Sequence, residues 1–201
     1  MCGICGIVNF RHQPVKETDL KSMMLKIKHR GPNDEGVFQH ENMGFGFVRL
    51  SIIDLSSAGH QPMQDESGRY TIIFNGEIFN YIELREELLK QGLKFQSQTD
   101  TEVLLKMYIT YGAACLNKLN GMFAFAIHDK ETNRIFAARD RFGVKPFYYA
   151  LTETGFVFAS EIPAILEVYG KENKADHSVI FDYLAFNRTD HTENTFFEGI
   201  K

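Results

Sequence analysis

Strand-like segments dominate this chain, and the segments of helical character lie in separate groups among them. Short apolar or β-branched segments predict strands at 2–10, 43–50, 70–74, 122–128, 134–139, 147–150 and 156–160. Apolar residues at helical spacing predict helices at 20–27, 80–92, 101–111 and 179–186. Because strands and helices do not alternate regularly, the pattern favours an α+β layered fold over a βαβ repeat.

Local signals mark the ends of these elements. Asn80 and Glu83 have the spacing of a capping box at the start of a helix, and Gly92 would end that helix. The segment His29–Gly36 has the composition of a loop.

With 201 residues the chain is long enough for one sizeable domain with its own core. Its character changes near Asp176, where a short helical stretch leads into a polar segment, 187–194. We therefore expect one domain over 1–175 and, over 176–201, the start of a connection to a further C-terminal domain.

Several classes of protein are disfavoured. The net charge of -4 offers no basic surface for nucleic acid. No apolar run approaches the roughly 20 residues that cross a bilayer. The histidines lack metal-site spacing, and no phosphate-binding glycine loop occurs, so we expect no metal site in this chain. The N-terminus does not resemble a signal peptide, and three cysteines do not form a disulfide framework, so we expect a cytoplasmic protein.

Cys2 follows a methionine that is normally removed when the next residue is small, which would leave Cys2 with both a thiol and a free α-amine. An α-amine has a pKa of about 7.7–8.0, so it can accept a proton near neutral pH and activate a nucleophile on its own residue. A small residue at position 2 can equally be without function. Cys2 and Cys5 also form a C-x-x-C, but an odd separation on a strand would point the two thiols to opposite faces, which disfavours a redox pair or half a metal site. Cys5 and Cys115 are then expected to be core residues.

Asn75 and Gly76 follow the apolar segment 70–74. Asn-Gly is first of all a turn signal, but the segment after it has helical character. A side-chain amide beside a glycine N–H offers two donors for one oxygen, as an oxyanion hole requires. Arg49 and Asp100 are candidates to clamp the carboxylate and the amino group of an amino acid; the alternatives are a surface charge and a helix cap.

Nine short pieces run the length of the chain: MCGICGI (1–7), HRGP (29–32), RLSIIDL (49–55), GHQP (59–62), FNGEIFNY (74–81), TDTE (99–102), NGMFAF (120–125), RDRFGVKP (139–146) and SE (160–161). In this order they resemble the class II glutamine amidotransferases, a group of N-terminal nucleophile hydrolases, and they are most similar to the glutaminase domain of glutamine-hydrolysing asparagine synthetase. The resemblance implies a four-layer αββα sandwich and hydrolysis of L-glutamine to glutamate and ammonia through a thioester on Cys2.

The resemblance also implies residue roles. Cys2 would be the nucleophile with its α-amine as proton acceptor, and the Asn75 side chain with the Gly76 N–H would form the oxyanion hole. The residues that would hold glutamine are Arg49, Leu50, Ser51, Ile52, Ile53, Asn75, Gly76, Glu77 and Asp100. Two positions depart from the family pattern: Asn33, where Asp is usual, and Phe47, where His is common.

The chain would then be the N-terminal part of an ATP-dependent asparagine synthetase, or of a relative that modifies another carboxylate. A C-terminal synthetase domain would hold aspartate, ATP and Mg²⁺, this chain would need no cofactor, and a homodimer is compatible with the resemblance. The alternatives are the glutaminase half of a glucosamine-6-phosphate synthase or a phosphoribosyl amidotransferase, and a non-catalytic regulatory domain. The RLSIIDL piece disfavours the first two, and intact Cys2, Asn75 and Asp100 disfavour the third.

Overall fold

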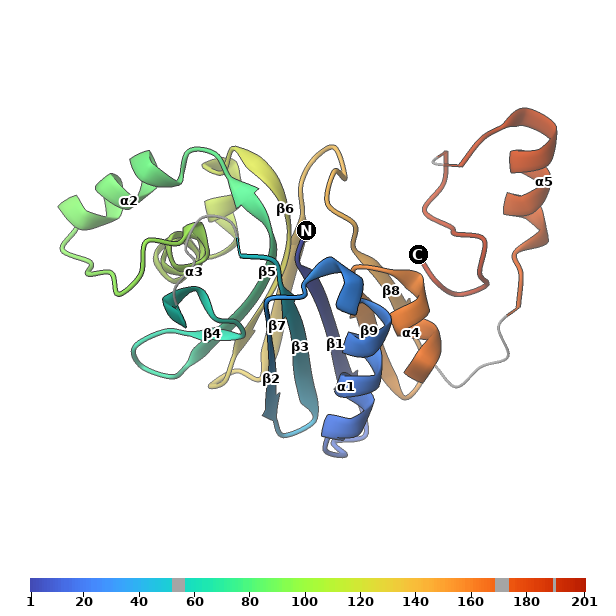
Figure 1. Ribbon diagram of the computed structural model, residues 1–201, viewed down its shortest axis with the longest axis horizontal. Helices are drawn as coiled ribbons and strands as arrows, with labels where there is room; N and C mark the ends of the chain where they lie inside the picture. Colours follow the sequence, from blue (N-terminus) through green and yellow to red (C-terminus); the bar gives the residue numbers. More distant parts are fainter. Residues whose placement is uncertain (52–56, 169–173, 190) are drawn as a thin grey trace.

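Two antiparallel sheets lie face to face in a computed structural model of the protein, which describes residues 1–51, 57–168, 174–189 and 191–201 (Figure 1). The first sheet has the strand order β2-β3-β1-β9-β8 and the second β4-β5-β6-β7. The strands are β1 (Gly3–Asn9), β2 (Asp34–His40), β3 (Met43–Arg49), β4 (Met63–Gln64), β5 (Tyr70–Ile78), β6 (Gly121–Asp129), β7 (Arg134–Arg139), β8 (Tyr148–Leu151) and β9 (Gly155–Ala159).

Helices cover the outer face of each sheet (Figure 1). Helices α1 (Glu17–Lys26) and α4 (Ile162–Val168) pack on the first sheet, and α2 (Tyr81–Lys90) and α3 (Asp100–Tyr111) on the second. Helix α5 (His177–Phe186) projects beyond α4 at the end of the chain. Short 3₁₀ turns are found at η1 (Lys28–Arg30), η2 (Ser57–Gly59) and η3 (Gly112–Asn117).

Three apolar cores separate these four layers. Along β1 the side chains alternate, so that Ile4 lies in the core between the sheets and Cys5 in the core between the first sheet and α1. The α1 residues Leu20 and Met23 are fully buried in that same outer core, at the helical spacing that the sequence contains. The predicted four-layer αββα sandwich is confirmed.

Three strands differ from the sequence prediction, and one of them, the short β4, was not predicted. Residues 34–40, partly assigned to a loop, form β2, whose pairing with β3 aligns Phe38 with Phe45. Strand β5 does not end at Phe74 but continues through Ile78, because β6 pairs with it along its whole length. Asn75 and Gly76 therefore lie inside a strand rather than in a turn, since tertiary pairing overrides the local turn preference.

The helix caps also differ from the expectation. The Asn80 side chain precedes α2 without capping it; it accepts a hydrogen bond from the Asn120 N–H and donates one to the Lys118 carbonyl. The capping box predicted from Asn80 and Glu83 is therefore wrong. Helix α3 is capped by Thr99, whose hydroxyl accepts a hydrogen bond from the Glu102 N–H.

The end of the chain returns to the first sheet. Tyr149 of β8 and Lys201 exchange two backbone hydrogen bonds, and Ile200 is buried in the core beneath α1. The domain boundary at 175/176 stays a prediction. None of the helices in the described part of the chain is long and apolar enough to pass through a membrane.

Candidate active site

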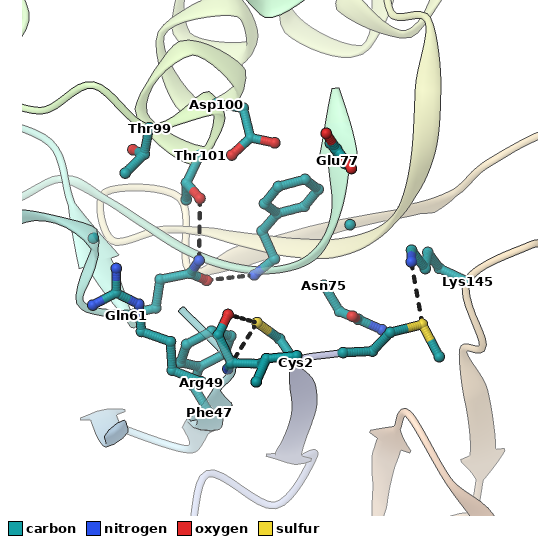
Figure 2. A pocket seen from close by; sticks show the side chains of 15 residues that line it. Cys2, Phe47, Arg49, Gln61, Asn75, Glu77, Thr99, Asp100, Thr101 and Lys145 are labelled. Carbon is teal, nitrogen blue, oxygen red and sulfur yellow. Dashed lines mark hydrogen bonds between the residues drawn. The ribbon is translucent and has the colours of Figure 1, made fainter. Parts of the chain in front are cut away.

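A cavity opens at one end of the layer between the two sheets (Figure 2). Its lining is Met1, Cys2, Phe47, Arg49, Leu50, Gly59, Gln61, Phe74, Asn75, Gly76, Glu77, Thr99, Asp100, Thr101 and Lys145. Strand periodicity explains the meeting of three of these side chains. Ile4, Phe47 and Ile73 lie in the inter-sheet core, so Cys2, two residues before Ile4, and Arg49 and Asn75, two residues after Phe47 and Ile73, face the same layer.

Cys2 lies just before β1, and the Leu50 backbone brackets its thiol. Sγ is 3.4 Å from the Leu50 nitrogen and 3.5 Å from the Leu50 carbonyl oxygen. The Arg30 Nε donates to the Cys2 carbonyl over 3.0 Å, and Arg30 is itself paired with Glu161. Burial raises the pKa of the Cys2 thiol, although the Leu50 N–H and the charge of Arg49 act in the opposite direction. The thiol therefore rests protonated at neutral pH, and any use of it as a nucleophile requires a base.

The edge of β5 nearest the cavity presents a row of backbone N–H groups. Phe123 of β6 is opposite Gly76, but it directs its own N–H and carbonyl toward Asp140 and not toward β5. Because hydrogen bonding alternates along an antiparallel pair, the backbone N–H groups of residues 74, 76 and 78 point away from β6. The Phe74 N–H donates to the Gln61 side chain over 2.7 Å, and the Ile78 N–H donates to Asp100 over 3.0 Å. The Gly76 N–H lies between them and faces the cavity.

The pair Asn75-Gly76 therefore offers two donors at one place. Asn75 is 1% exposed, and among the described residues its Nδ2 has no hydrogen-bond partner. An amide nitrogen left buried and unpaired is costly unless a ligand completes it. A Cβ on Gly76 would lie 2.3 Å from the Met122 carbonyl oxygen, so only glycine fits at this position.

Two of the residues that line the cavity are buried and charged. Arg49 at the end of β3 is 7% exposed and Asp100 at the start of α3 is 5% exposed. The surface-charge alternative for Arg49 and the helix-cap alternative for Asp100 are both wrong, since Thr99 provides the cap. Burial raises the pKa of Asp100 to about 6, and the nearby charge of Glu77 adds to this effect. A cation bound beside this carboxyl would stabilise its charged form, which burial disfavours.

The segment after β3 is only partly described. The Ser51 N–H donates to the Asn33 side chain over 3.0 Å, so the position that departs from the family pattern anchors the start of this segment. Ile52 and Ile53 lie outside the described residues. Phe47, the other departure, is fully buried in the inter-sheet core and lines the cavity beside Cys2.

The whole chain, residues 1–201, matches the glutamine amidotransferase domain family. This chain belongs to that family. It is 44% identical over 190 residues to asparagine synthetase 1 (glutamine-hydrolysing) of Bacillus subtilis, covering 92% of this chain and 30% of that protein. It is 42% identical over 207 residues to asparagine synthetase 3 (glutamine-hydrolysing) of the same organism, covering 100% of this chain and 33% of that protein. The chain thus spans about a third of the length of these relatives.

Solved structures share the fold. The glutamine phosphoribosylpyrophosphate amidotransferase of B. subtilis, solved with ADP and GMP, superposes with a TM-score of 0.72 at 22% identity over 84% of this chain and 44% of that one. At this identity the likeness concerns the fold alone. The amidotransferase fold that the sequence predicted is therefore confirmed by a second route.

Sequence reasoning missed four residues in or beside this candidate site. Gln61 bridges the β5 edge to Thr101, Arg30 and Glu161 hold the Cys2 backbone, and Lys145 closes one wall. All four fall in the short pieces HRGP, GHQP, RDRFGVKP and SE, but the sequence contains no sign of what they contact.

The other two cysteines of the amidotransferase domain are core residues, as expected. Cys5 is fully buried on the opposite face of β1 from Cys2, and burial raises its pKa to about 12. Cys115 is fully buried under α3, and burial raises its pKa to about 11. The described residues contain no group of three or more His, Cys, Asp or Glu side chains suited to a metal ion.

Proposed function

We propose that this domain hydrolyses L-glutamine to glutamate and ammonia through a γ-glutamyl thioester on Cys2. The observation that carries the proposal is the Asn75 amide, a buried and unpartnered donor in the described structure that lines the same cavity as the Cys2 thiol. A donor kept without a partner beside a nucleophile suits an oxygen that becomes negative only during the reaction.

The reaction follows from these groups once Met1 has been removed. The α-amine of Cys2 takes the thiol proton, directly or through a water molecule, and the thiolate attacks the side-chain carbonyl carbon of glutamine. The oxyanion accepts hydrogen bonds from the Asn75 Nδ2 and the Gly76 N–H. The proton passes to the departing ammonia, and water then cleaves the thioester, which frees glutamate and restores the thiol.

The buried charges suit the remote end of the substrate. Arg49 would bind the α-carboxylate and Asp100 the α-ammonium, which would stabilise the charged form of Asp100 that burial disfavours. Leu50, Ser51, Ile52, Ile53 and Glu77 would complete the binding site.

The relatives suggest a larger enzyme. We infer that this domain is the N-terminal part of an asparagine synthetase-like protein in which a C-terminal domain holds aspartate, ATP and Mg²⁺ and receives the ammonia. A cytoplasmic location and a homodimer belong to the same proposal. Aspartate activation needs a nucleotide site, and the sequence of this chain contains no phosphate-binding glycine loop.

One assay tests both parts. The purified chain, with removal of Met1 verified by mass spectrometry, receives glutamine, aspartate, ATP and Mg²⁺, and glutamate, asparagine and AMP are measured. We expect glutamate without asparagine or AMP, and no glutamate from Cys2→Ala. Asparagine or AMP above background would reveal a nucleotide site in this chain. No glutamate from a chain with a free Cys2 amine would favour a regulatory domain.

A further inference from the structure

Lys145 lines the cavity, and none of the chemistry above uses its ammonium group. The residue is 9% exposed, and its Nζ lies 3.2 Å from the Met1 sulfur (Figure 2). Lys106 is exposed to the same 9%, but its Nζ meets the carboxylates of Glu66 and Glu102. Lys145 forms no ion pair with a described residue, and a thioether is a weak acceptor. Burying a cation beside so weak an acceptor costs free energy of folding, which suggests that the charge has a role at this site.

Hydrogen bonds within its loop fix the backbone of Lys145 in place. The Asp140 carboxylate accepts four backbone N–H groups, those of Phe123, Phe142, Val144 and Lys145. The Arg139 side chain donates two more hydrogen bonds to carbonyls of the same loop. Because Phe123 belongs to β6, the backbone of Lys145 is held against the second sheet at the end where the cavity opens.

The contact with the Met1 side chain places the Lys145 ammonium beside the N-terminal residue. Met1 is bonded to the Cys2 nitrogen, which becomes the α-amine when Met1 is removed. The other charged groups facing the cavity or the Cys2 backbone are Arg30 of η1, Arg49 of β3, Glu77 of β5 and Asp100 of α3. Arg30 is neutralised by its pair with Glu161, whereas Lys145 brings a positive charge to the N-terminal residue itself.

We propose that Lys145 is a positioning residue that keeps the α-amine of Cys2 in its free-base form at neutral pH. The inference rests on the proposed function, because the free base is the form that accepts the thiol proton. An unperturbed α-amine, with a pKa of about 7.7–8.0, is mostly protonated at pH 7. A second positive charge close by disfavours that protonated form. The thiol proton moves to the amine lone pair and later to the departing ammonia, so Lys145 exchanges no proton.

Three variants separate charge from structure. Lys145→Met removes the charge and keeps the length of the side chain, Lys145→Arg keeps the charge, and Lys106→Met removes an equally buried lysine elsewhere. Lys145→Gln serves if the methionine variant does not fold. Each protein is labelled with ¹⁵N-cysteine, freed of Met1 as checked by mass, and titrated by the ¹⁵N chemical shift of the α-amine. Only three cysteines carry the label, and only Cys2 carries it as an amine.

We expect Lys145→Met to raise the midpoint of the amine titration by about one pH unit, whereas the other two variants leave it near that of the native chain. The acidic limb of kcat/KM for glutamine should move by the same amount, so turnover falls about four- to sixfold at pH 7 and recovers at higher pH. An unchanged midpoint in Lys145→Met would overturn the inference, as would an equal loss of turnover at every pH. The titration needs no turnover, so a shifted midpoint in a chain that makes no glutamate would support the role of Lys145 and contradict the proposed function.

Discussion

Cys2, just before strand β1, and Cys5, within that strand, carry the same thiol in different surroundings. Cys2 is half-buried, its thiol meets the Leu50 N–H, and it faces a cavity with charged walls. Cys5 is fully buried under α1, and its thiol donates to the Gly46 carbonyl over 3.6 Å. Burial raises both pKa values and a backbone hydrogen bond opposes that effect at each thiol, but at Cys2 the positive charge of Arg49 opposes it as well. The two thiols differ because the two faces of the sheet border different surroundings, and they point away from each other instead of meeting as a C-x-x-C pair.

Replacing the nucleophile should produce the largest difference between the two faces. Cys2→Ala should lower kcat for glutamine hydrolysis by about 10⁴–10⁶, and Cys2→Ser nearly as much, because the thioester cannot form. Cys5→Ala should keep kcat within about twofold and lose about 1 kcal/mol in the free energy of unfolding, since it removes only a packed sulfur. Both are measured by glutamate release and urea unfolding. Full activity in Cys2→Ala would contradict the proposed thioester mechanism.

The oxyanion donor should give the next largest effect. Asn75→Ala should lower kcat by about 10²–10³ with a smaller change in KM, because the lost donor acts mainly on the developing charge. Asn42 is a matched control, a buried asparagine whose amide donates to the Asn9 carbonyl instead of facing the cavity. Asn42→Ala should affect unfolding but not turnover. If Asn75→Ala raised KM and left kcat unchanged, Asn75 would contribute to the binding of glutamine and not to stabilisation of the oxyanion.

The buried charges should act on binding. Arg49→Met and Asp100→Asn should each raise KM for glutamine by about 10–100-fold, the worth of a hydrogen bond to a charged group, with less change in kcat. Steady-state kinetics with glutamine measures both constants. Unchanged kcat and KM in Asp100→Asn would leave Asp100 a structural residue that accepts the Ile78 N–H.

The pH dependence should give the smallest effect. Asp100 binds an ammonium only when ionised, and its pKa of about 6 means that it becomes protonated as the pH falls through that value. KM should therefore rise about tenfold between pH 7 and pH 5, by simple titration of one group. The KM of Asp100→Asn should be flat over this range. A native chain whose KM is constant down to pH 5 would show that Asp100 does not bind the substrate in its ionised form.

Local patterns predicted much of this fold correctly. The alternation along β1 assigned Cys2 and Cys5 to opposite faces, and the helical spacing of Leu20 and Met23 marked the face of α1 that is buried. Both signals succeed because they depend on neighbours within one element. The continuation of β5 through Asn75 and Gly76 could not be predicted in this way, since it is β6 that holds those residues in a strand.

In the candidate site, too, some features follow from the local sequence and others only from the tertiary structure. The sequence by itself determined which residue types were available: a thiol behind a removable methionine, an amide beside a glycine, and two opposite charges. Only the tertiary structure decided that β1, β3 and β5 end at one cavity, that the edge of β5 stays open at Gly76, and that Lys145 is buried against the N-terminus. The reason is physical: the side-chain period within a strand is local, whereas the meeting of strand ends depends on how two whole sheets pack, through contacts between residues far apart in the chain.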